Sequence, residues 1–175
     1  KEGPVVFVSN HQGYADIPVM FAVFRNFQFG FVAKQYLAKI PLYGPWMPRI
    51  RSVFIENDDP RAALRAINTG IEYINDGFSL VICPEGTRSR GPEVGPFMRG
   101  AMKLATKPGV PIIPVAINGT YRMYEETGIV KGTRIDVKVF PAIPTAGMSR
   151  ADEKDLAGKV EDIIRSGVAE LVSLN

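Results

Sequence analysis

The chain has 175 residues, of which 46% are hydrophobic and 22% are charged, and its formal net charge at pH 7 is +3. These proportions are ordinary for one folded domain with a sizeable core. The positive excess is too small to indicate nucleic-acid binding, but it suits an acidic substrate or an anionic membrane surface. The chain contains one cysteine and one histidine, which excludes an intrachain disulfide and argues against a structural zinc site.

The chain begins at Lys1 rather than at a methionine, and its first apolar run starts only a few residues later. No secretory signal precedes this run, and no window holds the roughly 18 uninterrupted apolar residues that a membrane-spanning helix needs. The lone cysteine makes a reducing, intracellular setting the default. We therefore expect a single domain over residues 1–175, trimmed from a longer chain whose natural N-terminus lies further upstream.

Apolar runs alternate along the chain with segments of helical periodicity. We predict strands at 5–8, 29–32 (running on to Lys34), 53–56, 79–83, 112–117 and 134–140. We predict helices at 17–24, 36–40, about 60–75, 100–107 and about 151–174, the last with Ser149 as its N-cap. The segment 41–48 contains three prolines and is predicted to be a loop. The alternation predicts an α/β fold with a single, mostly parallel sheet flanked by helices.

The first predicted strand ends in a polar corner that holds the single histidine, His11, with Asp16 five residues later. A neutral imidazole accepts a proton at one ring nitrogen while the other donates to a carboxylate, which fixes the tautomer and stabilises the imidazolium. A turn between a strand and a helix folds two side chains at this spacing onto one site. His11 is therefore a candidate general base oriented by Asp16, and the alternative is a structural pair in which His11 caps a turn.

A second polar corner, Cys83–Arg90, follows the fourth predicted strand. Its Gly86 permits a close ligand approach, and Arg88 offers a planar fork suited to phosphate. The alternative is a salt-bridged surface loop. In parallel sheets ligands bind beyond the carboxyl ends of the strands. Because His11, Lys34 and the residues 85–88 all follow predicted strands, we expect them to face one cleft.

Together these residues resemble the glycerolipid acyltransferase family, whose best-known members are the 1-acylglycerol-3-phosphate (lysophosphatidate) acyltransferases. The family's His-x4-Asp motif matches His11–Asp16, and its Phe-Pro-Glu-Gly-Thr-Arg-Ser motif matches Cys83–Ser89 with cysteine in place of phenylalanine. Its apolar strand with two prolines matches Val110–Val115, and Phe97–Gly100 loosely resembles its Phe-Lys-x-Gly. The resemblance covers residues 4 to about 120.

The resemblance implies a glycerol-3-phosphate acyltransferase-like fold, with a mostly parallel or mixed sheet. It implies transfer of a fatty acyl group from a coenzyme A or acyl carrier protein thioester to the sn-2 hydroxyl of 1-acylglycerol-3-phosphate, giving phosphatidate, with no cofactor. His11 and Asp16 then form the general base. Binding of the lysophospholipid acceptor is assigned to Lys34, Glu85, Gly86, Thr87 and Arg88, with Lys34 and Arg88 on the phosphate and Glu85 with Gly86 shaping the glycerol pocket.

One motif departs from the family pattern. Gly-x-x-Phe-Ile-Asp-Arg is replaced by Ser52–Asn57, so that Asn57 stands where the family has an arginine assigned to the acceptor's phosphate. Either the acceptor is glycerol-3-phosphate or another lysolipid, or another basic residue compensates. The candidates for that compensation are Lys34, Arg49, Arg51 and Arg88.

The resemblance also implies a membrane-associated protein at the cytoplasmic face, with upstream docking helices that this chain lacks. Within the chain, Tyr43, Trp46 and Met47 stand beside Arg49 and Arg51, a mixture that suits a membrane interface; the alternative is a loop folded over the core. The five phenylalanines between positions 21 and 31 are interpreted mainly as core, and alternatively as the wall of an acyl tunnel.

Two other function classes remain open. A lipid or thioester hydrolase would use His11 to activate water or Ser9 as nucleophile, although the chain has no Gly-x-Ser-x-Gly elbow. A non-catalytic lipid-binding domain would keep the basic and aromatic surface, and the intact pair of His11 and Asp16 argues against it.

Overall fold

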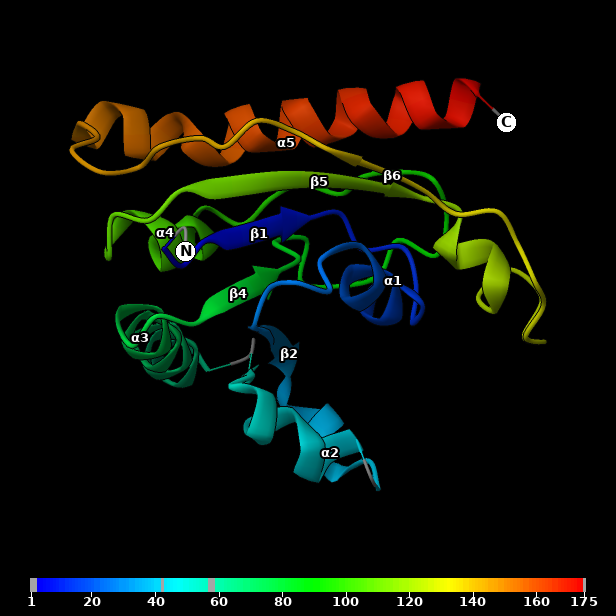
Figure 1. The fold of residues 1–175 in the computed structure, drawn as a ribbon, viewed down its shortest axis with the longest axis horizontal. Helices are drawn as coiled ribbons and strands as arrows, with labels where there is room; N and C mark the ends of the chain where they lie inside the picture. Colours follow the sequence, from blue (N-terminus) through cyan, green and yellow to red (C-terminus); the bar gives the residue numbers. More distant parts are fainter. Residues whose placement is uncertain (1–2, 42, 57–58, 175) are drawn as a thin grey trace.

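The computed structural model describes residues 3–41, 43–56 and 59–174. Over these residues the chain forms a six-stranded sheet with the strand order β3-β2-β4-β1-β5-β6 (Figure 1). The strands are β1 (Val6–Ser9), β2 (Phe29–Lys34), β3 (Val53–Ile55), β4 (Ser79–Ile82), β5 (Ile112–Asn118) and β6 (Asp136–Val139). Neighbouring strands are parallel except for the antiparallel pair of β5 and β6. The predicted α/β fold with a mostly parallel, mixed sheet is confirmed.

Helices lie on both faces of this sheet. The α-helices are α1 (Asp16–Val23), α2 (Tyr43–Trp46), α3 (Pro60–Asn75), α4 (Lys103–Thr106) and α5 (Arg150–Ser173). Four 3-10 turns join them, at Gln35–Lys39, Met47–Ile50, Arg99–Met102 and Thr120–Met123. Residues of α3, α4 and α5 share one core, and residues of α1 belong to the core on the opposite face. Within the described ranges, no helix combines the length and the apolar character needed to cross a membrane.

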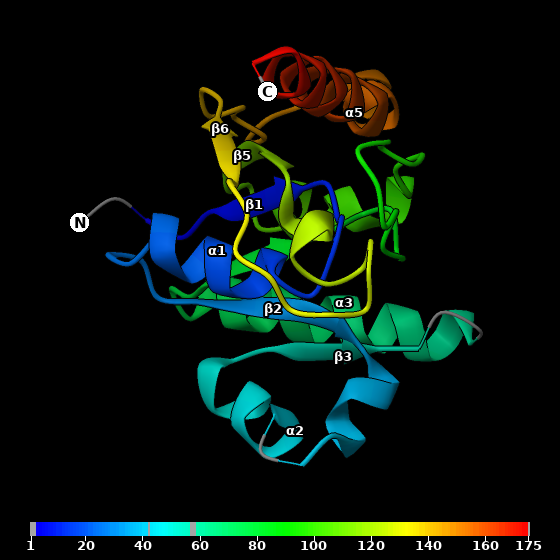
Figure 2. The same ribbon diagram turned by 90° about the vertical axis from the view of Figure 1, so that its right-hand side faces the viewer.

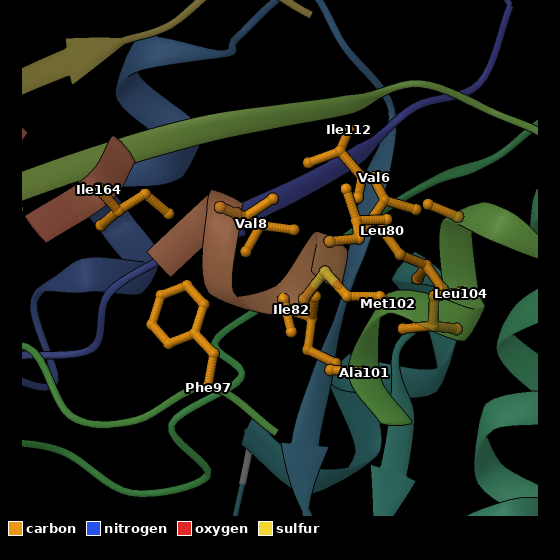
Figure 3. Close-up of a cluster of buried hydrophobic side chains, with 14 of the residues drawn as sticks. Val6, Val8, Leu80, Ile82, Phe97, Ala101, Met102, Leu104, Ile112 and Ile164 are labelled. Carbon is orange, nitrogen blue, oxygen red and sulfur yellow. The ribbon is translucent and has the colours of Figure 1, made fainter. Parts of the chain in front are cut away.

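The strands divide their side chains between these two cores. Val6 and Val8 of β1 lie in the same cluster as Leu104 of α4 and Ile164 of α5 (Figure 3), whereas Phe7, between the two valines, lies in the cluster under α1. Both faces of the central strands are therefore buried, which is why those strands appear in the sequence as continuous apolar runs.

The segment predicted as a loop, 41–48, differs from that prediction. It contains the single-turn helix α2 and the beginning of the turn Met47–Ile50. The prolines limit the length of these helices without preventing them, because proline is tolerated in a first helical turn. Met47 is 0% exposed, so its interpretation as a membrane-facing residue is wrong and its interpretation as core is right. Trp46 is 38% exposed, and its ring lies 5.7 Å from that of Phe21.

Candidate active site

The parallel strands end at one edge of the sheet, and the predicted corners meet there. The arrowheads of β1, β4 and β5 point to the right in Figure 1, and Figure 2 views the molecule from that side. His11 follows β1, Lys34 ends β2 and Cys83 follows β4. All three line one cavity of about 320 Å³.

The cavity has a polar part and an apolar part. Its polar lining includes Ser9, His11, Asp16, Lys34, Thr87, Arg88 and Arg90, with Gly86 beside them. Its apolar lining includes Ile17 and Met20 of α1, Phe31 of β2, Leu37, Ile55 of β3, Val81 of β4 and Met98. A polar reacting group and a long apolar chain can therefore occupy the same site at once.

His11 and Asp16 are in direct contact. Nδ1 of His11 lies 2.6 Å from Oδ2 of Asp16, and the Asp16 side chain is only 4% exposed, against 26% for His11. With Nδ1 donating to the carboxylate, Nε2 is the ring nitrogen left to accept a proton. The pair has the geometry of an oriented general base. The ring nitrogen Nδ1 contacts the Asp16 carboxylate, whereas the alternative from the sequence has His11 capping a turn.

The Asp16 carboxylate is held by three further donors. Its Oδ2 accepts the backbone N–H groups of Gln12 (2.8 Å) and Gly13 (3.0 Å), which the tight turn after β1 directs at it. Its Oδ1 accepts the hydroxyl of Thr120 at 2.5 Å. A buried carboxylate with this many donors is held in one orientation.

The turn after β1 is also fixed to the end of β5. The side-chain amide of Asn10 exchanges two hydrogen bonds with the backbone of Ile117, at 2.9 and 2.8 Å. Oε1 of Gln12 accepts the backbone N–H of Gly119 at 2.9 Å and lies 3.3 Å from the Thr120 hydroxyl oxygen. The loop that carries His11 therefore has little freedom to move relative to the sheet.

Glu85 supports the same loop from the other side. Its two carboxylate oxygens accept the backbone N–H groups of His11 and Gly95, each at 2.7 Å. Burial raises the pKa of Glu85 above its usual value, although these two hydrogen bonds act in the opposite direction. Gly86 and Thr87 line the cavity, while the Glu85 carboxylate is occupied by backbone donors. The structure thus places Glu85 as a support for His11 rather than as part of the glycerol pocket.

Arg88 lines the cavity and is paired with a residue 37 positions further along the chain. Its Nη1 lies 3.0 Å from Oε1 of Glu125, and its guanidinium carbon lies 3.7 Å from the centre of the Tyr14 ring. Next to it in the lining is Arg90, whose backbone N–H donates to the carbonyl of Gln12 at 3.2 Å.

The candidates for replacing the missing family arginine are separated by the fold. Lys34 and Arg88 line the cavity. Arg51 instead lies over the rings of Tyr73 and Phe78, at the end of the sheet where β3 and β4 begin. Arg51 is therefore not one of the cations that line the cavity. Arg49 belongs to the turn that precedes Arg51, and Asn57 itself lies outside the described residues.

Two potential nucleophiles of the site are unsuited to that role. The Ser9 residue is 1% exposed, and its hydroxyl donates to the Asn10 carbonyl at 2.9 Å. Burial, together with the nearby charges of Asp16 and Glu85, raises the pKa of the Cys83 thiol well above its usual value, so that the thiolate is disfavoured. In the described part of the chain, no three His, Cys, Asp or Glu side chains are grouped so as to hold a metal ion.

The phenylalanines between positions 21 and 31 are mainly core, as interpreted from the sequence. Phe24, Phe29 and Phe31 are less than 9% exposed and make ring contacts with one another or with neighbouring rings. Phe27 is 41% exposed, and Phe31 also lines the cavity, so one residue of the group serves both the core and the site.

Several residues of the site were not predicted. Thr120 and Gln12 hold the Asp16 carboxylate and its loop, Glu125 pairs with Arg88, and Arg90 joins the cavity lining. A signal existed for Thr120, because the polar residues directly after the fifth predicted strand end at the same sheet edge as His11. No sequence signal marks Glu125, which lies 37 residues from Arg88.

Comparisons with known proteins identify relatives of this chain. The family model described as Acyltransferase matches residues 1–118. The chloroplastic 1-acyl-sn-glycerol-3-phosphate acyltransferase BAT2 of Brassica napus is 35% identical over 120 residues, which are 69% of this chain and 34% of that protein. A protein of Borreliella burgdorferi named 1-acyl-sn-glycerol-3-phosphate acyltransferase is 28% identical over 94% of this chain and 66% of its own length.

A solved structure extends the agreement to the fold. The crystal structure of the 1-acyl-sn-glycerophosphate (LPA) acyltransferase PlsC from Thermotoga maritima superimposes with a TM-score of 0.79 at 32% sequence identity, covering 98% of this chain and 67% of that chain. The present chain spans about a third of the length of BAT2 (34%) and of the chloroplastic 1-acyl-sn-glycerol-3-phosphate acyltransferase LPAT1 of Arabidopsis thaliana (33%). The family match covers more than half of the chain and includes both polar corners, and the chain belongs to the acyltransferase family.

Proposed function

We propose that this chain is the catalytic core of an enzyme that transfers a fatty acyl group from a thioester to the sn-2 hydroxyl of 1-acylglycerol-3-phosphate, giving phosphatidate. The observation that carries the proposal is the His11–Asp16 pair, with 2.6 Å between Nδ1 and Oδ2, at a cavity that is lined by cationic and by apolar side chains. The relatives named as 1-acyl-sn-glycerol-3-phosphate acyltransferases, and the PlsC structure, support it.

The chemistry follows from the roles of the two ring nitrogens. Nε2 of His11 removes the proton of the acceptor hydroxyl while that oxygen attacks the thioester carbonyl carbon. The tetrahedral intermediate collapses, the C–S bond breaks, and the imidazolium returns its proton to the departing thiolate. Asp16 stabilises the imidazolium, and such general-base assistance is typically worth about 10²–10⁴-fold. The acceptor hydroxyl is the nucleophile, so neither Ser9 nor Cys83 is required, and the reaction uses no cofactor beyond its donor.

The cations at the cavity bind the acceptor's phosphate. Lys34 and Arg88, already expected in this role, are joined by Arg90 from the same lining. Three cationic side chains, one of them paired with Glu125, thus offer several N–H donors to a phosphate monoester. This arrangement accounts for an acceptor site that functions with Asn57 in place of the usual arginine. The donor is a coenzyme A or acyl carrier protein thioester. Apolar lining residues, among them Met20, Phe31 and Leu37, contact its acyl chain.

The proposed substrate is a lipid, and the protein acts on it at the cytoplasmic face of a membrane. Near the active-site edge, the exposed aliphatic residues Ile129 (72%) and Val130 (69%) precede Lys131 in the segment after β5. Exposed apolar residues beside a basic one suit the boundary between lipid headgroups and acyl chains. Trp46 of α2, which is 38% exposed, is a second candidate for that contact.

The experiment is acyl transfer by the full-length parent protein, read by mass spectrometry of the products. The acceptors are lysophosphatidate, glycerol-3-phosphate and a phosphate-free lysolipid, each with coenzyme A and acyl carrier protein thioesters. We expect phosphatidate from lysophosphatidate, reduced by about 10²-fold or more in His11→Ala. The exposed substitution Glu126→Gln serves as the matched control, and circular dichroism confirms that each variant is folded.

The other outcomes separate the alternatives. Product from glycerol-3-phosphate or from another lysolipid alone retains the mechanism and changes the acceptor. Release of free fatty acid without transfer supports the hydrolase interpretation. Near-normal transfer by a folded His11→Ala protein contradicts the general-base mechanism.

A further inference from the structure

Glu125 is a buried carboxylate outside the motifs of the acyltransferase family. It follows the turn Thr120–Met123 and lies beyond the residues 1–118 that match the family model. Figure 1 shows the segment after β5, coloured yellow-green to yellow, at the right-hand end of the molecule, past the carboxyl ends of the strands. The Glu125 side chain is only 3% exposed. A carboxylate is rarely buried to this extent unless it is paired, so its partners indicate its role.

Those partners belong to the active-site loops. Oε1 of Glu125 accepts two hydrogen bonds, one from Nη1 of Arg88 at 3.0 Å and one from the backbone N–H of Tyr14 at 2.7 Å. The Tyr14 ring in turn lies under the guanidinium, with its centre 3.7 Å from the guanidinium carbon. Arg88 is therefore held from two directions, by a charge at one nitrogen and by an aromatic face beneath its plane.

The loop that carries His11 is shaped to admit this carboxylate. A Cβ atom at Gly13 would lie 2.5 Å from Oε2 of Glu125, closer than real Cβ contacts allow. The same Gly13 donates its backbone N–H to Asp16. Glycine at this position thus permits Glu125 to approach the turn that also orients the base, which distinguishes the contact from an incidental surface ion pair.

The pairing leaves part of the guanidinium available. Arg88 lines the cavity, its side chain is 16% exposed, and Glu125 contacts one of its terminal nitrogens. A guanidinium has five N–H donors in a rigid fork, and a phosphate is bound best by two parallel donors. Fixing one edge of the fork determines where the remaining donors point.

We propose that Glu125 is a positioning residue for the acceptor's phosphate, acting by holding Arg88 in the orientation that presents its remaining N–H donors to the cavity. This inference rests on the proposed function, because it assumes a phosphate acceptor bound by Arg88. It adds a residue that contacts no substrate and lies outside the family match. A purely structural role for Glu125 predicts a loss of thermal stability without any change that depends on the acceptor's phosphate.

The test compares KM and kcat in the full-length parent protein. Glu125→Gln keeps an oxygen for the Tyr14 N–H and removes the charge that orients Arg88. We expect KM for lysophosphatidate to rise by about 10- to 10²-fold, the range that misplacement of a binding group produces, while kcat stays within about threefold. The inhibition constant of the matching monoacylglycerol, which lacks the phosphate, stays within about threefold of its original value. Glu126→Gln, which removes the same charge from an exposed neighbour paired with Lys131, leaves both constants unchanged.

Two more variants keep the test decisive. In an Arg88→Gln background, adding Glu125→Gln has no further effect on KM if Glu125 acts through Arg88. Tyr14→Leu removes the exposed ring under the guanidinium but keeps the backbone N–H. We expect it to raise KM for lysophosphatidate by a smaller factor than Glu125→Gln does. This variant still tests the positioning of Arg88 if the Glu125→Gln protein does not fold.

The possible results separate the proposed function from the positioning role of Glu125. Absence of transfer to lysophosphatidate by the unmodified protein overturns the proposed function. An active unmodified protein whose Glu125→Gln and Tyr14→Leu variants leave the KM for lysophosphatidate unchanged overturns the positioning role. Equal losses for the phosphate and phosphate-free compounds, or additive effects with Arg88→Gln, also overturn it.

Discussion

The two sides of the active-site cavity are built in different ways. The side formed by the loops after β1, β4 and β5 is a network in which side chains bond to backbone groups of distant segments, as Asn10 does with Ile117 and Glu85 with Gly95. The side formed by β2, the turn Gln35–Lys39 and β3 is mainly apolar, although it also carries Lys34. Side-chain hydrogen bonds between loops hold the first side in one geometry, whereas the second side is shaped mainly by the strands and by apolar packing.

This difference separates the two tasks of the proposed reaction. Proton transfer needs atoms fixed to within a fraction of an ångström, and the networked side holds the proposed base. An acyl chain needs apolar surface of suitable width and tolerates adjustment of the residues that surround it. Substitutions around the proposed base should therefore lower the rate, whereas substitutions of residues that bind the acceptor's phosphate or the acyl chain should change KM or substrate preference.

The largest effect is expected from Asp16→Asn on the networked side. The amide cannot accept the backbone N–H groups of Gln12 and Gly13 with the strength of a carboxylate, and it no longer stabilises the imidazolium. We expect kcat to fall by about 10²–10⁴-fold, with KM changed much less. Steady-state kinetics with lysophosphatidate as the acceptor measure both kcat and KM.

The control for Asp16→Asn is Asp155→Asn, the same removal of a carboxylate charge at an exposed position of α5. It should leave kcat unchanged. A folded Asp16→Asn protein that retains more than a tenth of the original kcat would contradict the role of the carboxylate.

An intermediate effect is expected from Thr120→Val, which removes the hydroxyl donor to Asp16 while keeping the shape of the side chain. A hydrogen bond to a charged group contributes about 1.5–3 kcal/mol, so kcat should fall by about 10- to 10²-fold. Thr120→Ser keeps the hydroxyl and should recover most of the activity. If the two variants have the same kcat, the hydroxyl is not what orients Asp16.

A smaller effect that depends on the acceptor is expected from Lys34→Gln on the apolar side. Loss of one of the cations around the pocket should raise KM for lysophosphatidate by about tenfold, which corresponds to one charge-assisted contact. The matching monoacylglycerol should bind as before, since it carries no phosphate. Arg51→Gln, at the opposite edge of the sheet, is the control, and an equal rise of KM in that variant would show that general charge attraction is responsible.

The same contrast explains what the sequence could predict. The six strands, and the pair of His11 and Asp16, depend on short-range spacing: apolar runs, a turn, and two residues five apart. The motifs around these residues also mark the family. Local patterns therefore predicted the sheet and the proposed base.

The supporting residues depend on contacts between distant parts of the chain. Thr120 is 104 residues from Asp16, and Glu125 is 111 residues from Tyr14, so that only the arrangement of β1 beside β5 brings them together. Glu85 is interpreted from the sequence as a pocket residue, because the sequence does not reveal its partners. Those partners are the backbone N–H groups of His11 and Gly95, and the fold of two loops brings them to Glu85. At 41–48, proline content suggested a loop because single-turn helices have almost no periodicity to detect.

The smallest effect is expected from Cys83→Ala, a change at the cavity lining where the loop after β4 begins. Burial and the charges of Asp16 and Glu85 raise the pKa of the thiol, so it stays protonated through neutral pH and up to its raised pKa, and only above that pH does the thiolate form. A protonated thiol with a weak contact to the Asn10 carbonyl, at 3.8 Å, contributes little. We expect kcat/KM to stay within about threefold, since a weak contact is worth about 0.5–1 kcal/mol, and iodoacetamide to modify Cys83 slowly at pH 8. A fall in activity of the size expected for Asp16→Asn, with rapid alkylation, would instead place a reactive thiolate in the cavity and replace direct transfer by an acyl-enzyme route.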